Sequence, residues 1–171
     1  MTAFVALVRA VNLGADTTLP SAELRRIGEA CSFAAVRTFI ASGNLLFTAE
    51  EGEEDVAERV RGGVEAFLGK PALVLVRSAA EMGEVVRSNP FPDDPGNRVV
   101  AFFLPDAPTR AMIDAATGVK AERLALGQRE IVIAYDEGMG RSKLKLPAFK
   151  LSTGRNMNSV AKMADLLAAM A

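Results

Sequence analysis

Residues 36–47, VRTFIASGNLLF, decide the fold because they predict a β-hairpin. Residues 36–40 alternate in polarity, as a half-buried strand does, and residues 45–47 return as a second strand. Between them Ser42-Gly43-Asn44 forms the turn, since a Gly-Asn centre suits the tight connection of a hairpin.

The flanking segments place this hairpin between two helices and two further strands. Residues 3–11 are a nearly continuous apolar run, which predicts a strand buried on both faces. Pro20 marks the start of a helix before the hairpin, and the acidic residues 50–55 open another helix after it. Residues 72–76 then form a strand. The first 77 residues therefore predict the β-α-β-β-α-β order of the ferredoxin-like pattern.

The second half repeats most of this order. A capping box at Ser78-Ala79-Ala80-Glu81 opens a third helix, and the Pro/Asp/Gly-rich loop 91–97 follows it. The elements expected after the loop are a strand at 99–104, a helix from Pro108, a hairpin of 123–126 with 131–135, and a last helix from about Arg155 to Met170. This order is β-α-β-β-α, without an obvious last strand.

These patterns predict an α+β protein of two ferredoxin-like units, packed as one interlocked globular protein. The first unit spans residues 1–77 and the second spans residues 98–171 with the last helix. Residues 78–97 supply a connecting helix and loop.

Composition excludes several kinds of chemistry. The chain contains no histidine, which removes Ser-His-Asp and Cys-His catalysis and histidine-ligated zinc, and we expect no metal site. The single cysteine cannot form an internal disulfide, which suits a reducing cytoplasm. No apolar run approaches the length of a transmembrane helix, so we expect a cytoplasmic protein without a membrane partner.

Charge is distributed unevenly along the chain. Residues 138–164 hold six Lys and Arg and no Asp or Glu, whereas the remaining 144 residues hold 14 basic and 21 acidic side chains. A positive C-terminal block on a negative body indicates a surface that faces an anion.

The expected start of the last helix carries the main candidate site. Helix starts favour carboxylates, yet this first turn has none and Arg155 lies close to it. An anion bound by the free N–H groups, Arg155, Asn156 and Asn158 would turn an unfavourable charge placement into an attraction. In the alternative interpretation Arg155 is solvated or paired with a distant acid. The cap of the helix is then Ser152, Thr153 or Asn156.

Other candidate residues lie in loops. Lys143 follows the glycine loop Gly138-Met139-Gly140, which is the general layout of a phosphate cradle, although it is not a Walker A motif. Arg9 is the only charge of the first strand and needs a partner if it is buried. Asn12, Ser42 and Asn44 lie at strand ends, where they either bind a ligand or shape the turns.

Six motifs together make the chain resemble the bacterial family catalogued as "domain of unknown function 1697". They are RAVNLG (9–14), LPSAELR (19–25), VRTFIASGN (36–44), NPF (89–91), RSKL (141–144) and TGRNMNSV (153–160). The resemblance implies two ferredoxin-like units in one chain and implies no activity. Ala15 and Met157 depart from the family pattern, in which a second glycine and a tryptophan are usual.

These observations lead to three functional hypotheses. The first is binding of an anionic, phosphorylated small ligand at the start of the last helix, with no reaction predicted and no cofactor identified. The second is a nucleic-acid-binding module that uses the basic block, although the chain has no tryptophan and one tyrosine for base stacking. The third is a protein-interaction module for an acidic partner. The oligomeric state is not predicted, nor is whether the N-terminal and C-terminal polar loops share a pocket.

Overall fold

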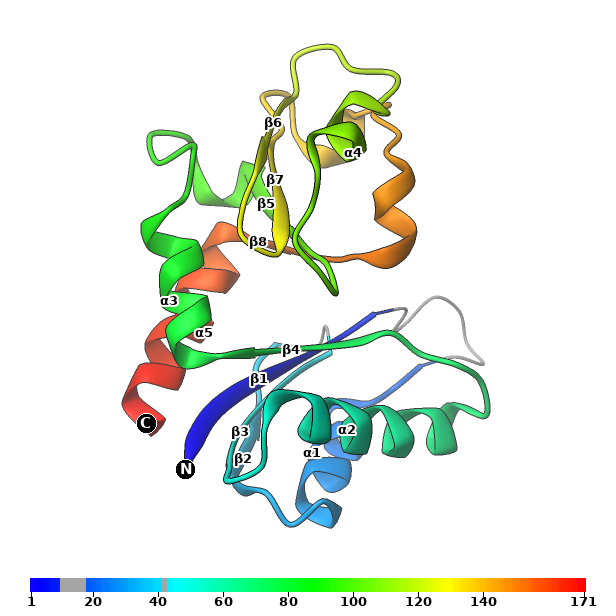
Figure 1. The fold of residues 1–171 in the computed structure, drawn as a ribbon, viewed down its shortest axis with the longest axis vertical. Helices are drawn as coiled ribbons and strands as arrows, with labels where there is room; N and C mark the ends of the chain where they lie inside the picture. The colour runs from blue at the N-terminus through cyan, green and yellow to red at the C-terminus, as the bar shows by residue number, and fades with distance from the viewer. Residues whose placement is uncertain (10–17, 41–42) are drawn as a thin grey trace. The chain divides into compact units, whose positions relative to one another are not determined.

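The computed structural model describes residues 1–9, 18–40 and 43–171, and the chain forms two compact units. Unit 1 consists of Met1–Met82 together with Met163–Ala171, and unit 2 is the continuous segment Gly83–Lys162. Each unit contains a four-stranded antiparallel sheet (Figure 1). The predicted α+β class with two β-α-β-β-α-β-type units is confirmed.

Unit 1 follows the predicted order of elements. In chain order it contains β1 (Thr2–Val8), α1 (Ser21–Ala30), β2 (Ala34–Thr38), β3 (Asn44–Ala49), α2 (Glu53–Leu68), β4 (Val74–Ser78) and the first part of α3 (Ala79–Arg87). The strands lie side by side as β2-β3-β1-β4, and every neighbouring pair is antiparallel. The capping bond expected at the start of α3 is present, since Glu81 N donates to Ser78 Oγ at 3.2 Å.

Helices α1 and α2 cover one face of the first sheet (Figure 1). Alternate strand residues such as Phe4 and Phe47 join the apolar stripe of α2 in a single core, because successive strand side chains point to opposite faces. The two helices approach closely at Gly63, where a Cβ would lie 2.5 Å from Ile27 Cγ2.

The predicted hairpin is confirmed by β2 and β3, and its turn depends on two of the predicted residues. Gly43 has φ 75°, a left-handed conformation that glycine adopts without steric cost. Asn44 is fully buried, and its Nδ2 donates to Phe39 O at 3.1 Å. Asn44 therefore performs the turn chemistry expected of it, while Ser42 lies outside the described residues.

Unit 2 has the same strand arrangement. After the end of α3 it contains η2 (Gly96–Arg98), β5 (Val99–Phe103), α4 (Arg110–Asp114), β6 (Arg123–Leu126), β7 (Glu130–Ala134), η3 (Met139–Arg141), η4 (Pro147–Leu151), β8 (Thr153–Asn156) and the start of α5 (Met157–Met170). The order β6-β7-β5-β8 corresponds to β2-β3-β1-β4, and the 3-10 helix η4 stands where unit 1 has the long helix α2.

Strand β8 corrects one sequence expectation. The pattern predicted no last strand and a helix from about Arg155, but residues 153–156 pair with β5 and the helix begins at Met157. The segment Thr-Gly-Arg-Asn lacks the alternation of apolar residues that marks a strand, so its pairing depends on the neighbouring β5. Gly154 lets β8 pass close to the ring of Phe102, because a Cβ there would lie 2.8 Å from Phe102 Cε1.

Candidate functional site

The residues predicted at the start of the last helix have internal partners. Asn156 Oδ1 accepts a hydrogen bond from Ser159 N at 2.9 Å, which confirms the alternative that Asn156 caps α5. Asn158 packs on η2, since a Cβ on Gly96 would lie 2.1 Å from Asn158 Oδ1. One N–H group of the first turn is therefore already satisfied by the chain itself.

Arg155 lies on β8 opposite Ala101 of β5 and is 8% exposed. Its Nη1 donates to Thr153 Oγ1 at 2.6 Å and to Gly154 O at 2.9 Å. Burial lowers the pKa of Arg155 to about 10, because a charged guanidinium is disfavoured away from water. The side chain remains charged at neutral pH and is held by the strand on which it lies.

The N-terminal candidates belong to unit 1. Arg9 is half-buried just after β1, and its backbone N donates to Leu73 O at 2.9 Å. Asn12 lies outside the described residues, as Ser42 does. The structure therefore describes Arg9 and Asn44 in unit 1, and Lys143, Arg155, Asn156 and Asn158 in unit 2.

Lys143 lines a small polar pocket in unit 2, which we call the cation pocket. Three segments form its walls: residues 120–122 before β6, residues 135–138 after β7, and residues 141–143, which begin at the last residue of η3. The cavity measures about 50 Å³, room for one or two waters or for a group the size of a phosphate. It lies beyond the end of the β6–β7 ladder, where Arg123 pairs with Ala134.

Gly118 lies where the chain just before wall segment 120–122 meets wall segment 141–143. Its φ of 71° is left-handed, and a Cβ there would lie 2.3 Å from the carbonyl oxygen of Lys143. Thr117 and Lys145 exchange backbone hydrogen bonds of 2.9 and 2.8 Å beside this contact. Only glycine satisfies both the backbone conformation and the close approach at this position.

Two of the three carboxylates in the pocket walls are occupied by partners. Glu122 accepts hydrogen bonds from Lys120 N at 2.7 Å and from Ser142 Oγ at 2.8 Å, and these bonds hold the pKa of Glu122 below its ordinary value. Asp136 Oδ1 accepts a 2.7 Å bond from Arg123 Nη2, which also binds Asp94. The third carboxylate, Glu137, is exposed.

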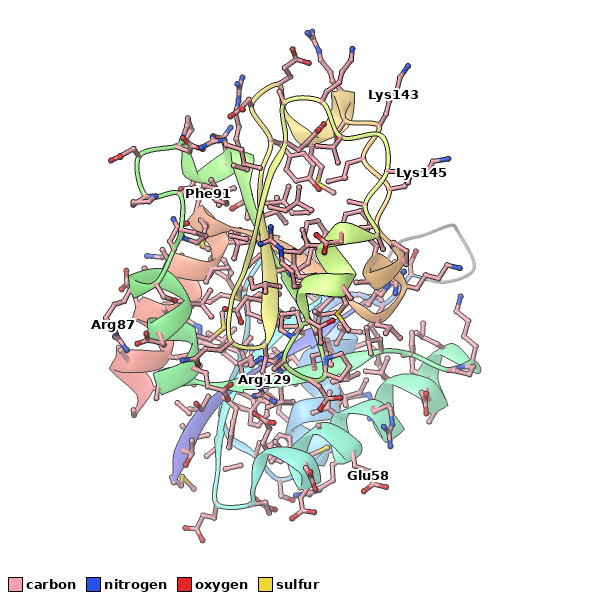
Figure 2. All side chains as sticks on the ribbon, turned by 45° about the horizontal axis from the view of Figure 1, so that its top comes forward. Glu58, Arg87, Phe91, Arg129, Lys143 and Lys145 are labelled. Carbon is pink, nitrogen blue, oxygen red and sulfur yellow. The ribbon has the colours of Figure 1, made fainter. Side chains whose placement is uncertain are left out.

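Three cations of the pocket form no close ion pair in the described residues, although the charge of Lys120 helps to lower the pKa of Glu122. Across residues 1–9, 18–40 and 43–171, no ion pair involves the side chain of Lys120, Arg141 or Lys143. All three side chains are exposed, and Figure 2 shows Lys143 and Lys145 pointing away from the ribbon. The pocket therefore presents the charges of Arg141 and Lys143, and that of Lys120 beside Glu122, around a cavity of about 50 Å³.

Tyr135 forms the buried part of the wall and is 3% exposed. Burial, with a smaller contribution from the charge of Glu122, raises the pKa of Tyr135 to about 12. The phenol therefore stays neutral at physiological pH.

The sequence identified one of the three cations, Lys143, as a site residue. Lys120 and Gly118 were missed because they lie more than 20 residues earlier, in the connection between α4 and β6. The available signal was Gly118-Val119-Lys120, a glycine turn before a basic residue, which resembles the loop Gly138 to Arg141. Within the described part of the chain, no group of three Cys, Asp or Glu side chains is placed to hold a metal ion.

Comparison with solved structures identifies a protein whose fold is similar over almost the whole chain. The structure of conserved bacterial protein SP0830 from Streptococcus pneumoniae matches with a TM-score of 0.82 and 21% sequence identity, over 97% of this chain and 98% of that chain. At this identity the likeness shows the fold alone. No curated protein matches the sequence. None of the helices in the described residues combines the length and the apolar character needed to cross a bilayer.

The family resemblance seen in the sequence has independent support. The family model described as "Protein of unknown function (DUF1697)" matches residues 1–131. The match includes the wall segment 120–122 of the cation pocket and ends within β7. Because this match covers well over half of the chain, the protein belongs to the family of unknown function DUF1697.

Proposed function

We propose that unit 2 binds the phosphate group of an anionic ligand in the cation pocket. The observation that carries the proposal is the pairing state of the pocket's charges. Its cations Lys120, Arg141 and Lys143 form no ion pair among the described residues, while two of its three carboxylates, Glu122 and Asp136, are engaged. A phosphate carries about −1.5 to −2 charges at neutral pH and accepts hydrogen bonds from several donors at once.

The proposed ligand is anionic, as the sequence predicts. Its main contacts are now expected in the cation pocket, which includes the loop after β7, rather than at the start of α5. The overall charge of unit 2 supports this assignment, since the unit holds 12 Lys and Arg against 9 Asp and Glu. Unit 1 holds 8 Lys and Arg against 12 Asp and Glu, so the excess of positive charge belongs to unit 2. We also propose a cytoplasmic location, because the single cysteine suits a reducing compartment.

Calorimetric titration with inorganic phosphate and with phosphoserine tests the proposal. Lys143→Ala should weaken binding by roughly 10-fold or more, because a hydrogen bond to a charged group contributes about 1.5–3 kcal/mol. Lys145→Ala is the matched control, since Lys145 is also exposed and lies two residues away but does not line the pocket.

Two outcomes would reject the phosphate site. One is the absence of binding of either compound to the unmodified protein. The other is an equal loss of affinity in Lys143→Ala and Lys145→Ala, which would indicate general attraction to a basic surface. A steep dependence of oligonucleotide binding on salt, with no effect of Lys143→Ala, would favour the nucleic-acid hypothesis instead.

A further inference from the structure

Strand β6 forms one edge of the unit 2 sheet and pairs with β7 alone. Gly127 N donates to Glu130 O at 2.7 Å, so residues 127 and 130 form a hydrogen-bonded pair of the ladder. Such pairs alternate with non-bonded pairs along antiparallel strands. The backbone N–H and C=O groups of Leu124 and Leu126 therefore point away from β7, toward the open edge.

These outward groups are unpaired within residues 1–9, 18–40 and 43–171. Neither Leu124 nor Leu126 donates or accepts a backbone hydrogen bond outside the β6–β7 ladder there. Leu126 is 40% exposed. A row of unpaired backbone groups of this kind can accept an added strand.

The equivalent edge of unit 1 lacks this regularity. Strand β2 has a register shift between Ala34 and Arg37, and Ala35 in that interval has φ 51°. A bulge of this type interrupts the edge and discourages pairing with another chain. The β6 ladder shows no shift from Arg123 to Leu126. The edge strand β6 is thus regular where its counterpart β2 is interrupted.

The cation pocket lies at the N-terminal end of this open edge, since residues 120–122 of its wall lead directly into β6. Its volume of about 50 Å³ is far below the roughly 300–1,000 Å³ of pockets that enclose a small molecule. The pocket can therefore hold one anionic group while the rest of the ligand lies outside it. Strand β6, which follows wall residue 122 directly, offers unpaired backbone donors and acceptors to that part of the ligand.

We propose that unit 2 binds an extended peptide carrying one phosphate group. The peptide adds as a fifth strand to β6 and places its phosphate among Lys120, Arg141 and Lys143. This inference rests on the proposed phosphate site. A peptide fits the edge better than a nucleic acid, because Tyr135 in the pocket wall is buried and the ring of Phe91 is covered by Arg123 at 5.0 Å, which leaves no flat face there for a base.

The register sets the length of the peptide. Leu126 lies six positions after Lys120, and an extended chain advances about 3.3 Å per residue. The phosphorylated residue should therefore lie about four to six residues from the one that pairs with Leu126. A segment of about eight residues spans the pocket and the edge.

The test uses three probes: a degenerate octapeptide library with phosphoserine at one end, the same library with serine, and free phosphoserine. We expect the phosphorylated library to bind at least tenfold more tightly than free phosphoserine, and the serine library to bind weakly. Leu126→Pro removes the outward N–H without breaking a bond to β7, whereas Leu126→Ala keeps it. The proline variant should lose about two- to tenfold in peptide affinity relative to the alanine variant, with equal phosphoserine affinity.

Amide hydrogen exchange gives a readout that needs no variant, in case the proline variant fails to fold. Peptide binding should slow exchange at Leu124 and Leu126, and free phosphoserine should not. One outcome would reject the edge inference and leave the phosphate site standing. In it, phosphoserine binds, the phosphorylated library binds no more tightly than phosphoserine, and the amides of Leu124 and Leu126 stay unprotected. Tighter binding of a 5′-phosphorylated oligonucleotide than of the peptide library would also overturn the peptide assignment. Failure of all three probes would reject the phosphate site itself.

Discussion

Tyr135 shows how one residue can report on the state of the cation pocket. It is the only tyrosine of the chain, and its side chain belongs both to the apolar core of unit 2 and to the pocket wall. Its neighbour in the wall, Asp136, is held by Arg123, and Arg98 donates to the Asp136 carbonyl. These bonds hold the backbone and the side chain of the residue that follows Tyr135 in the wall.

Ionisation of Tyr135 should destabilise the protein at high pH. Its pKa of about 12 lies above the ordinary value of 10.0, so the unfolded state loses the proton first as pH rises. The free energy of unfolding should therefore fall between about pH 10 and 12, by up to about 2–3 kcal/mol at roughly 1.4 kcal/mol per pKa unit. Ultraviolet titration of tyrosinate absorbance measures the pKa, and urea unfolding at each pH measures the stability.

Tyr135→Phe is the control for this titration, because lysines also lose their protons in the same range. The variant should show a smaller fall in stability between pH 10 and 12. An absorbance midpoint near pH 10 in the folded protein would contradict the buried position of the phenol.

At the scale of elements, close packing of α1 on α2 determines which side chains the helices tolerate. Gly62 and Gly63 are adjacent in α2 but meet different surroundings. A Cβ on Gly62 would have nothing within 4 Å, whereas a Cβ on Gly63 would lie 2.5 Å from Ile27 Cγ2.

Alanine at these two glycines should therefore have opposite effects. Gly62→Ala should raise the free energy of unfolding by about 0.5–1 kcal/mol, because alanine loses less backbone entropy in a helix. Gly63→Ala should lower it by about 1–3 kcal/mol, since the added methyl overpacks the contact with Ile27. Urea denaturation of both variants measures the difference, and a shift of the same sign in both would refute the packing argument.

At the scale of the whole molecule, unit 1 is assembled from both ends of the chain. Its last segment, Met163–Ala171, comes from the second half of α5, while unit 2 is continuous. Met163 and Leu167 in this segment are fully buried. The stability of unit 1 therefore depends on residues that follow unit 2 in the sequence.

A chain that ends after Lys162 should lose amide protection in the strands of unit 1. Full burial of one large apolar side chain contributes about 1.5–3 kcal/mol, so the loss of Met163 and Leu167 should cost roughly 3–6 kcal/mol. A chain that ends after Leu167 keeps both residues and serves as the control. Unchanged protection of β1, β3 and β4 in the shorter chain would show that the C-terminal segment does not stabilise unit 1.

Much of the fold could be predicted because its elements depend on local patterns. The hairpin around Gly43 and the helix start at Ser78 depend on turn and capping chemistry within a few residues. Strand β8 was missed because three polar residues and a glycine pair with β5 through their backbone, which side-chain periodicity does not reveal. The predicted start of α5, at about Arg155, was wrong for the same reason, because Arg155 and Asn156 belong to β8 and the helix begins at Met157.

The sequence by itself determined the α+β class, the order of most strands and helices, and the concentration of positive charge after Gly138. These properties follow from local patterns of polarity, glycine and charge. Only the tertiary structure decided how the charges are used. Strand pairing buries Arg155, capping engages Asn156, and the contact of Gly118 with Lys143 assembles the cation pocket from segments more than 20 residues apart. Long-range contacts of this kind leave no periodic signal in the sequence.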